Sequence, residues 1–504
     1  MSIARSSSDF PLRLGPPGEF ALVRTFLQHA GFEEPVICKK LDLGEMSDLG
    51  RVNWETIQIE NFPTPLRWSI QVFMRGLGVP QTEVKAAFGD QVLEAFHSLG
   101  LLRSAKRNPD SVVCPVWLYP ADGFLIASDR RDDPDGEPYS PPEDVVFPAI
   151  YAGTLRFLRL LPQTPGGEAL DLCGGSGIGA LHLSRCVRTA TTADLTERSA
   201  LFAEFNASLN AVPITSLCGD LYDPVAGLRF DVISAHPPFV PATGDNMVYR
   251  DGGETGEEVI RRVVEGLPDH LKPGGLAIIL CVARDTQEKP FERRVLDWLG
   301  DARQQFDVIF GLEKVLTVEE VVESIRKRGR AINDQQAHAL YGRLHSLGTL
   351  QFVYGALFIR QCATVVLEEP ARVRLTPSGT AKDFERLLAW RNHCRQPNFV
   401  EWLAGSRPYL APGLELNVRH VVASGQLTPA EFVFSIVDGF QAALRPDAWL
   451  TPLIAQLDGR HSVREVFDSM GAADELPEGF KLEDFARLVC TMIERGLLRV
   501  DLSK

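Results

Sequence analysis

A glycine-rich turn between an apolar run and a helix start carries the clearest chemistry in this sequence. The stretch 168–181 reads EALDLCGGSGIGAL, in which a short apolar run ends at Asp171 and glycines follow at once. Such a strand–turn–helix junction presents backbone N–H groups and the positive end of a helix dipole to a ligand. The glycines allow positive φ angles and let a ligand lie against bare backbone. The stretch therefore predicts a nucleotide-like cofactor and leaves its identity open.

Three further polar positions follow in chain order, each after a predicted strand. Asp194 ends the second strand, where a carboxylate accepts hydrogen bonds from ribose hydroxyls. Asp220 follows the third strand and is placed to contact an adenine amine. His236-Pro237-Pro238-Phe239, the HPPF tetrad, follows the fourth strand, where the reacting group would lie. Open parallel sheets bind ligands at the carboxyl ends of their strands, which is where all these positions are expected.

The elements that position these residues alternate between strands and helices over about residues 145–365. This alternation predicts an α/β domain with a parallel sheet and helices on both faces. Helices are expected at 197–210 and 257–270. The predicted strands are 169–172, 188–193, 214–217, 230–234, 276–281, 307–310 and 350–359.

These motifs together resemble those of class I S-adenosylmethionine-dependent methyltransferases. The resemblance rests on DLCGGSG, the acidic Asp194, Gly219-Asp220, DVISAHPPF and LKPGG, in that order. It is strongest to the branch with an NPPY-type motif, which includes glutamine N5-methyltransferases of release factors and guanine N2-methyltransferases of ribosomal RNA. The resemblance covers under half the chain and implies a Rossmann-like sheet of seven strands.

The resemblance assigns roles to particular residues. It implies that Asp171, Gly175 and Gly177 surround the methionine part of the cofactor. Asp194 would bind the ribose, and Asp220 with Leu221 would hold the adenine. The cofactor-binding set is Asp171, Cys173, Gly174, Gly175, Gly177, Asp194, Leu195, Asp220, Leu221 and His236. The expected acceptor-binding and catalytic set is His236, Pro237, Pro238, Phe239 and Arg250.

Two positions depart from the family pattern. Cys173 stands where the family usually has its first glycine, and His236 replaces the usual Asn, Asp or Ser. A neutral imidazole accepts one hydrogen bond and can act as a general base near pH 7. The acceptor is therefore open between an amide NH₂, a hydroxyl, a carboxylate, a ring nitrogen and an activated carbon. Arg250, in a glycine-rich loop expected to cover the pocket, would pair with a carboxylate or form a structural salt bridge.

Other functions remain open at this stage. Gly175, Gly177 and Ala180 also fit the G-x-G-x-x-A pattern of nicotinamide dehydrogenases. The unusual His236 also allows a scaffold that binds the cofactor without catalysis. The favoured acceptor is a protein side chain, a peptide or a small metabolite. An RNA guanine methyltransferase is the weaker alternative, because the chain has a net charge of −14.

Composition and flanking regions complete the expectations. The 504 residues predict several domains: a helical, winged-helix-like region and linker over 1–142, the methyltransferase domain over 143–368, and a helical, winged-helix-like region over 369–504. Residues 427–431, LTPAE, predict a helix start. Nine scattered cysteines without a CxxC pair argue against a zinc site and favour the cytoplasm. No membrane-spanning run is present, and the oligomeric state is undetermined.

Overall fold

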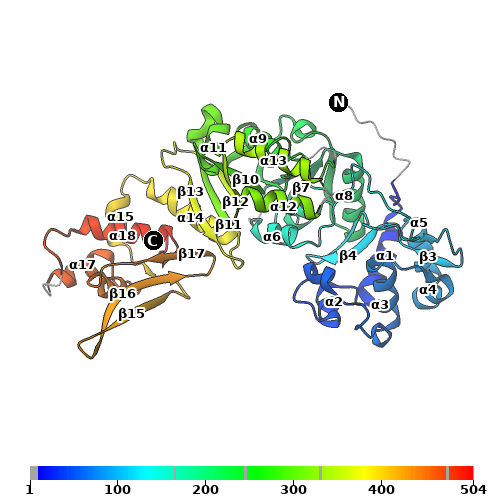
Figure 1. The fold of residues 1–504 in the computed structure, drawn as a ribbon, viewed down its shortest axis with the longest axis horizontal. Helices are drawn as coiled ribbons and strands as arrows, with labels where there is room; N and C mark the ends of the chain where they lie inside the picture. Colours follow the sequence, from blue (N-terminus) through cyan, green and yellow to red (C-terminus); the bar gives the residue numbers. More distant parts are fainter. Residues whose placement is uncertain (1–9, 164–165, 243–246, 329–331, 473–475, 503–504) are drawn as a thin grey trace. The chain divides into compact units, whose positions relative to one another are not determined.

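A computed structural model describes residues 10–163, 166–242, 247–328, 332–472 and 476–502 (Figure 1). The chain forms two compact units. The first comprises the described residues of Met1–Phe306 and Leu316–Leu367, and the second those of Asp307–Val315 and Glu368–Lys504. Within the described ranges, no helix is both long and apolar enough to cross a membrane.

The first unit is built on a mixed sheet with the strand order β12-β10-β9-β6-β7-β8. Strands β6 to β10 are parallel, and β12 pairs antiparallel with β10. Their bounds are β6 (Glu168–Leu172), β7 (Thr189–Asp194), β8 (Ile214–Cys218), β9 (Phe230–Ala235), β10 (Leu271–Thr286) and β12 (Thr349–Gln361). The centre of β10 is fully buried, as expected of a strand covered on both faces. The predicted α/β fold is confirmed, with β12 making the sheet mixed.

Helices connect and flank these strands (Figure 1). Helix α8 follows β7 with the predicted bounds, whereas the predicted helix 257–270 is divided by Gly266 into α9 and α10. A capping box begins α12: the Thr317 N–H donates to Glu320, and the Glu320 N–H donates to the Thr317 hydroxyl. The helices are α6 (Ala152–Leu160), α7 (Ile178–Leu183), α8 (Glu197–Asn210), α9 (Glu258–Glu265), α10 (Leu267–His270), α11 (Phe291–Trp298), α12 (Val318–Arg328) and α13 (Asp334–Ser346).

The order of the strands reverses between β6 and β9. From β6 the chain continues on one side through β7 to β8, and it returns to the other side at β9. Leu172, the last residue of β6, pairs with Ala235, the last residue of β9. The glycine-rich loop and the HPPF tetrad therefore begin side by side, at the position where open α/β sheets bind their ligands.

In the N-terminal region of the first unit, Phe26, Phe73, Phe88 and Phe96 pack against one another and form an aromatic core. The helices of this region are α1 (Pro17–His29), α2 (Glu34–Leu41), α3 (Thr64–Ser69), α4 (Gln81–Phe88) and α5 (Asp90–Ser98). A small sheet has the order β1-β3-β2, with β1 (Val79–Pro80), β2 (Arg103–Ser104) and β3 (Ser111–Val113). The hairpin of β4 (Trp117–Ala121) and β5 (Phe124–Ser128) follows. The winged-helix assignment of this region remains a prediction.

The second unit corrects the prediction for residues 427–431. These residues lie in β16 (Gln426–Ile436), which pairs antiparallel with β15 (Glu415–Ala423). Farther along β16, Phe434 and Ile436 are buried on alternate positions, and this strand pattern prevails over the local helix-capping signal. Pro429 is tolerated because the strand register shifts beside it.

Strands in the order β15-β16-β17-β13-β11 form much of the second unit, where the sequence predicted a mostly helical region. Its further strands are β11 (Phe306–Leu316), β13 (Ala371–Leu375) and β17 (Phe440–Leu444), with β14 (Tyr409–Leu410) paired to β18 (Leu498–Arg499). The helices are α14 (Ala381–Cys394), α15 (Phe399–Gly405), α16 (Leu450–Ala455), α17 (Val463–Ala472) and α18 (Leu482–Glu494). The winged-helix arrangement, the seven-strand count and the domain boundaries at 142/143 and 368/369 remain predictions.

Candidate active site

The glycine-rich loop is built around a buried carboxyl group. Asp171 is only 3% exposed and accepts a hydrogen bond of 2.7 Å from the Ser234 hydroxyl on β9. Burial raises the pKa of Asp171 to about 7. A Cβ added to Gly179 would lie 2.4 Å from the Asp171 carboxylate, so the first turn of α7 needs glycine at this position. The loop thus closes tightly over the end of β6.

The loop backbone turns through left-handed conformations. Cys173 has a φ of 55° and Gly175 one of 52°. This conformation explains why glycine is usual at position 173, and Cys173 adopts it at an expected cost of about 1 kcal/mol. A Cβ at Gly175 would meet no atom within 4 Å, and this residue lines the cavity described below. Gly177 has a packing role, because a Cβ there would lie 2.8 Å from the Cβ of Ala203 on α8.

Replacing Gly179 with alanine is expected to lower the free energy of unfolding by about 2 kcal/mol, because the new methyl group would overlap the buried Asp171 carboxylate. Gly175→Ala is the matched control in the same loop. Its Cβ has free space, so only the unfavourable φ should cost about 1 kcal/mol. Urea denaturation measures both effects. A larger loss in Gly175→Ala would contradict this account of the loop.

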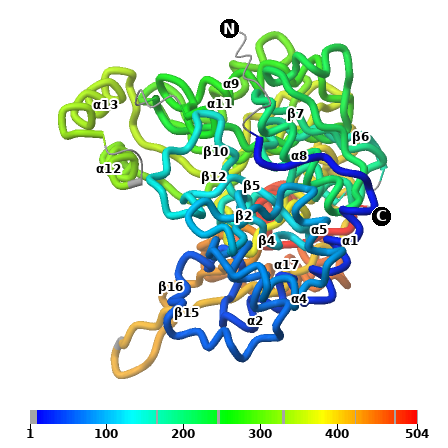
Figure 2. The backbone as a smooth tube through the Cα atoms, turned by 90° about the vertical axis from the view of Figure 1, so that its right-hand side faces the viewer, coloured from blue at the N-terminus to red at the C-terminus, as the bar shows by residue number. Residues whose placement is uncertain are grey.

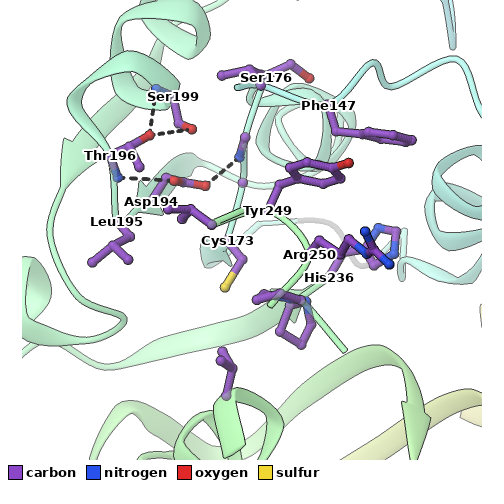
Figure 3. Close-up of a pocket in the computed structure, with 18 of the residues that line it drawn as sticks. Phe147, Cys173, Ser176, Asp194, Leu195, Thr196, Ser199, His236, Tyr249 and Arg250 are labelled. Carbon is purple, nitrogen blue, oxygen red and sulfur yellow. Dashed lines mark hydrogen bonds between the residues drawn. The ribbon is translucent and has the colours of Figure 1, made fainter. Parts of the chain in front are cut away.

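Asp194 connects the end of β7 to the glycine-rich loop. Its carboxylate accepts hydrogen bonds from the N–H groups of Gly175 at 2.9 Å and Thr196 at 3.3 Å. Burial raises the pKa of Asp194, and these hydrogen bonds oppose that shift by stabilising the charged form. The neighbouring Leu195 is 52% exposed and presents an apolar side chain at the cavity. Asp194 therefore links the loop after β7 to the glycine-rich loop and lines the cavity beside it (Figure 3).

Asp220 and Leu221 form the neighbouring wall. The Asp220 carboxylate accepts a hydrogen bond of 2.8 Å from the Arg262 guanidinium of α9, and both side chains are about half exposed. Leu221 is buried and has a φ of 49°. The Arg262 contact leaves Asp220 less available to a ligand amine than an unpaired carboxylate would be.

His236 begins the HPPF tetrad directly after β9. Its ring centroid lies 5.5 Å from that of Phe157 and 6.1 Å from that of Phe239. Burial lowers the pKa of His236 to about 4, so the imidazole is neutral at pH 7. This disagrees with the sequence-based suggestion of a general base near pH 7. A neutral imidazole retains one nitrogen that accepts and one that donates a hydrogen bond.

The loop at 247–257 folds against the chain that leaves the tetrad. The Val240 N–H donates to the Arg250 carbonyl at 3.0 Å, and the Gly252 N–H donates to the Val240 carbonyl at 2.9 Å. Glu257, at the end of the loop, is buried and accepts hydrogen bonds from Arg284 at 2.9 Å and Arg294 at 2.6 Å. These contacts fix the position of the loop backbone. The Arg250 side chain lies at the cavity (Figure 3).

One cavity of about 680 Å³ collects these features. Of the residues predicted to bind the cofactor or act in catalysis, all except Gly177 line it. Those that line it are Asp171, Cys173, Gly174, Gly175, Asp194, Leu195, Asp220, Leu221, His236, Pro237, Pro238, Phe239 and Arg250. The structure thus brings together loops that lie up to eighty positions apart in the chain, while the roles of the individual residues remain predictions.

An aromatic wall was not expected from the sequence. Phe147 stacks on Tyr249 with centroids 5.2 Å apart and planes at 16° (Figure 3). Tyr151 and Phe157 line the same cavity. The Arg131 guanidinium lies over the rings of Phe147 and Tyr151. Phe147 and Tyr151 lie in the segment before α6, Phe157 lies in α6 and Tyr249 lies in the loop at 247–257, so no single motif marks them. These aromatic side chains give the cavity a planar, apolar lining.

Comparison with protein families gives this site a context. Residues 148–303 match the family model of the methyltransferase small domain. This part of the chain is a methyltransferase small domain. The matched range contains β6 to β10 and therefore both loops at the strand-order reversal. The flanking regions lie outside the match.

Several curated relatives are glutamine methyltransferases. The chain is 28% identical over 207 residues to the ribosomal protein uL3 glutamine methyltransferase of Bradyrhizobium diazoefficiens, covering 35% of this chain and 63% of that protein. It is 28% identical to the namesake from Xanthomonas campestris pv. campestris, covering 45% and 75% respectively. A release factor glutamine methyltransferase of Xylella fastidiosa is 32% identical, covering 24% and 49%. The chain thus spans less than two thirds of the first and third of these relatives.

The alignment with a solved methyltransferase structure from Pyrococcus furiosus covers 45% of this chain and 89% of that protein's chain. The two are 18% identical and superpose with a TM-score of 0.27, a likeness too weak to support conclusions about fold or ligand.

The methyltransferase small domain supports S-adenosyl-L-methionine over the nicotinamide alternative. The cavity is consistent with S-adenosyl-L-methionine, because its lining contains five aspartates and two arginines. A carboxylate-rich cavity suits a cofactor with a sulfonium cation and no phosphate, whereas it would repel the pyrophosphate of a dinucleotide. The aspartates are Asp144, Asp171, Asp194, Asp220 and Asp251, and the arginines are Arg250 and Arg262. When bound, the cofactor would lie against the glycine-rich loop of the small domain and Asp194.

Proposed function

We propose that this chain is an S-adenosyl-L-methionine-dependent N-methyltransferase whose acceptor is a planar NH₂ group of a protein side chain, with an amide as the favoured case. The observation that carries the proposal is the position of the neutral His236 and the HPPF tetrad beside the glycine-rich loop. The names of the curated relatives support a glutamine side chain. The acceptor, the protein partner and the activity of the whole chain are all part of this proposal.

The chain's own residues would act by holding and orienting the acceptor. When bound, the cofactor would supply an electrophilic methyl group: as the N–C bond forms the C–S bond would break, S-adenosyl-L-homocysteine would leave, and the methylated nitrogen, then cationic and strongly acidic, would lose one proton to solvent. The accepting ring nitrogen of His236 and the carbonyl oxygen of Pro237 would each take a hydrogen bond from the NH₂ group, which aligns its nitrogen. Phe239 would pack on the planar group, and the loop at 247–257 would limit water access. With a pKa of about 4, His236 orients the acceptor and is too weak a base to deprotonate it.

The pH dependence of turnover distinguishes orientation from base catalysis. We expect kcat to be flat from about pH 6 to about pH 9 and to fall below about pH 5. The reason is that the pKa of His236 is about 4, so protonation converts its accepting nitrogen into a donor only in that acidic range. Single-turnover rates in buffers of constant ionic strength measure this. A rise in kcat with an apparent pKa between about 6 and 7 would instead indicate a base with an ordinary histidine pKa.

The function is tested with purified chain, methyl-labelled S-adenosyl-L-methionine and two candidate protein acceptors, a release factor and ribosomal protein uL3. Mass spectrometry of the digested acceptor should locate one added methyl group on a glutamine side chain. Reactions with His236→Ala serve as the control. Methylation of ribosomal RNA in parallel reactions would overturn the protein acceptor. Cofactor binding without methylation of any acceptor in a full cell extract would favour the scaffold alternative.

A further inference from the structure

A buried asparagine lies between the glycine-rich loop and the N-terminal region. Asn206, on α8, is fully buried. Its amide N–H groups donate to the carbonyl oxygens of Ser176 and Ala127, both at 2.9 Å. Its amide oxygen accepts a hydrogen bond of 2.8 Å from the Ala127 N–H. One side chain therefore connects a loop residue of the cavity with strand β5, which lies beside α8 (Figure 2).

This contact controls the orientation of one peptide group in the loop. The carbonyl of Ser176 accepts from Asn206, while the N–H of the same peptide group, on Gly177, donates to the Gly174 carbonyl at 2.8 Å. Both ends of the peptide plane are thus held, and the Ser176 carbonyl points to Asn206, a residue that does not line the cavity. An unpaired buried carbonyl would be free to reorient and would incur a desolvation cost.

We propose that Asn206 is a positioning residue for the cofactor loop, and that strand β5 of the N-terminal region thereby forms part of the support of the cofactor site. The inference rests on the proposed function in one respect, namely that the loop binds S-adenosyl-L-methionine. It gives the N-terminal region a role in cofactor binding. Asn206 touches neither substrate nor cofactor and acts through the Ser176 carbonyl.

The next turn of α8 offers a matched control. Asn210 accepts a hydrogen bond from the Leu125 N–H at 2.8 Å and donates to the Leu125 carbonyl at 2.7 Å. It makes the same paired contact to β5 as Asn206, and its other amide N–H donates within the helix to the Asn206 carbonyl. Since Asn210 does not contact the glycine-rich loop, a comparison of the two isolates the contact to Ser176.

The test is calorimetric titration of S-adenosyl-L-homocysteine into the full-length chain and its Asn206→Ala and Asn210→Ala variants. We expect Asn206→Ala to raise Kd by about tenfold, which corresponds to about 1.4 kcal/mol, and Asn210→Ala to raise it by less than about twofold. Circular dichroism verifies that each variant is folded. Equal Kd values for the two folded variants would overturn the inference.

A measurement on the unchanged chain covers the case in which Asn206→Ala fails to fold. Adding S-adenosyl-L-homocysteine should slow amide hydrogen exchange in the loop 173–178 and also at Ala127 in β5, because the shared amide couples them. Slower exchange in the loop with unchanged exchange in β5 would overturn the inference. A chain that does not bind S-adenosyl-L-homocysteine at all would instead overturn the proposed function, on which the inference rests.

Discussion

Replacing His236 with alanine should reduce kcat by about 100-fold while changing the Kd for S-adenosyl-L-homocysteine by less than about threefold. The side chain lies between Phe157 and Phe239 at the tetrad, whereas the predicted ribose- and adenine-binding positions follow β7 and β8. The loss should therefore fall on alignment of the acceptor. Rapid-quench single turnover measures kcat, and calorimetric titration measures the Kd.

His236→Asn is the informative companion variant. The asparagine side-chain oxygen accepts a hydrogen bond as the neutral imidazole does, so part of the activity should return. His236→Phe keeps an aromatic ring between Phe157 and Phe239 but offers no acceptor, so it should be as inactive as alanine. Full turnover in His236→Phe would mean that the imidazole only shapes the pocket.

Replacing Asp194 with alanine should weaken binding of S-adenosyl-L-homocysteine by about 100-fold, or about 3 kcal/mol. Two contributions add. The carboxylate accepts a hydrogen bond of 2.9 Å from the Gly175 N–H, which stabilises the conformation of the loop. In the proposed complex it also accepts hydrogen bonds from the ribose hydroxyls. Titration calorimetry gives the change in Kd, and denaturation separates it from any loss of stability.

Asp220→Ala is the matched comparison for Asp194→Ala. The Asp220 carboxylate already accepts a hydrogen bond from Arg262 and is about half exposed, so its removal should weaken binding by less than about tenfold. If Asp220→Ala weakened binding more than Asp194→Ala, the assignment of the ribose to Asp194 would be wrong. A loss of kcat at saturating cofactor in either variant would point to a role in the chemical step.

Cys173 illustrates how a departure from a motif is accommodated. Its backbone adopts the left-handed conformation that glycine favours, and burial raises the pKa of its thiol. The thiol is therefore uncharged near neutral pH and serves as a small apolar side chain at the cavity. This is consistent with a loop that keeps its fold while carrying one residue other than glycine.

The order of the chemistry-bearing residues could be predicted from the chain alone. Each of them follows an apolar run, and in parallel βα units the carboxyl ends of the strands meet at one edge. Local rules of this kind place Asp171, Asp194, Asp220 and His236 around one cavity, as observed. They also located α8 with its correct bounds, because its caps lie in the adjacent sequence.

Three features depended on the tertiary structure. The neutral state of His236 comes from burial of its ring, which lies near Phe157 of α6 and Phe239 of the tetrad. The link from Asn206 to the loop joins residues thirty positions apart through contacts that no motif encodes. At 427–431, pairing of β16 with β15 prevailed over a helix-capping signal. In each case the deciding interaction depends on how segments pack or pair in the fold, so spacing and composition determine where chemistry is possible, and packing determines the geometry and charge state of the groups there.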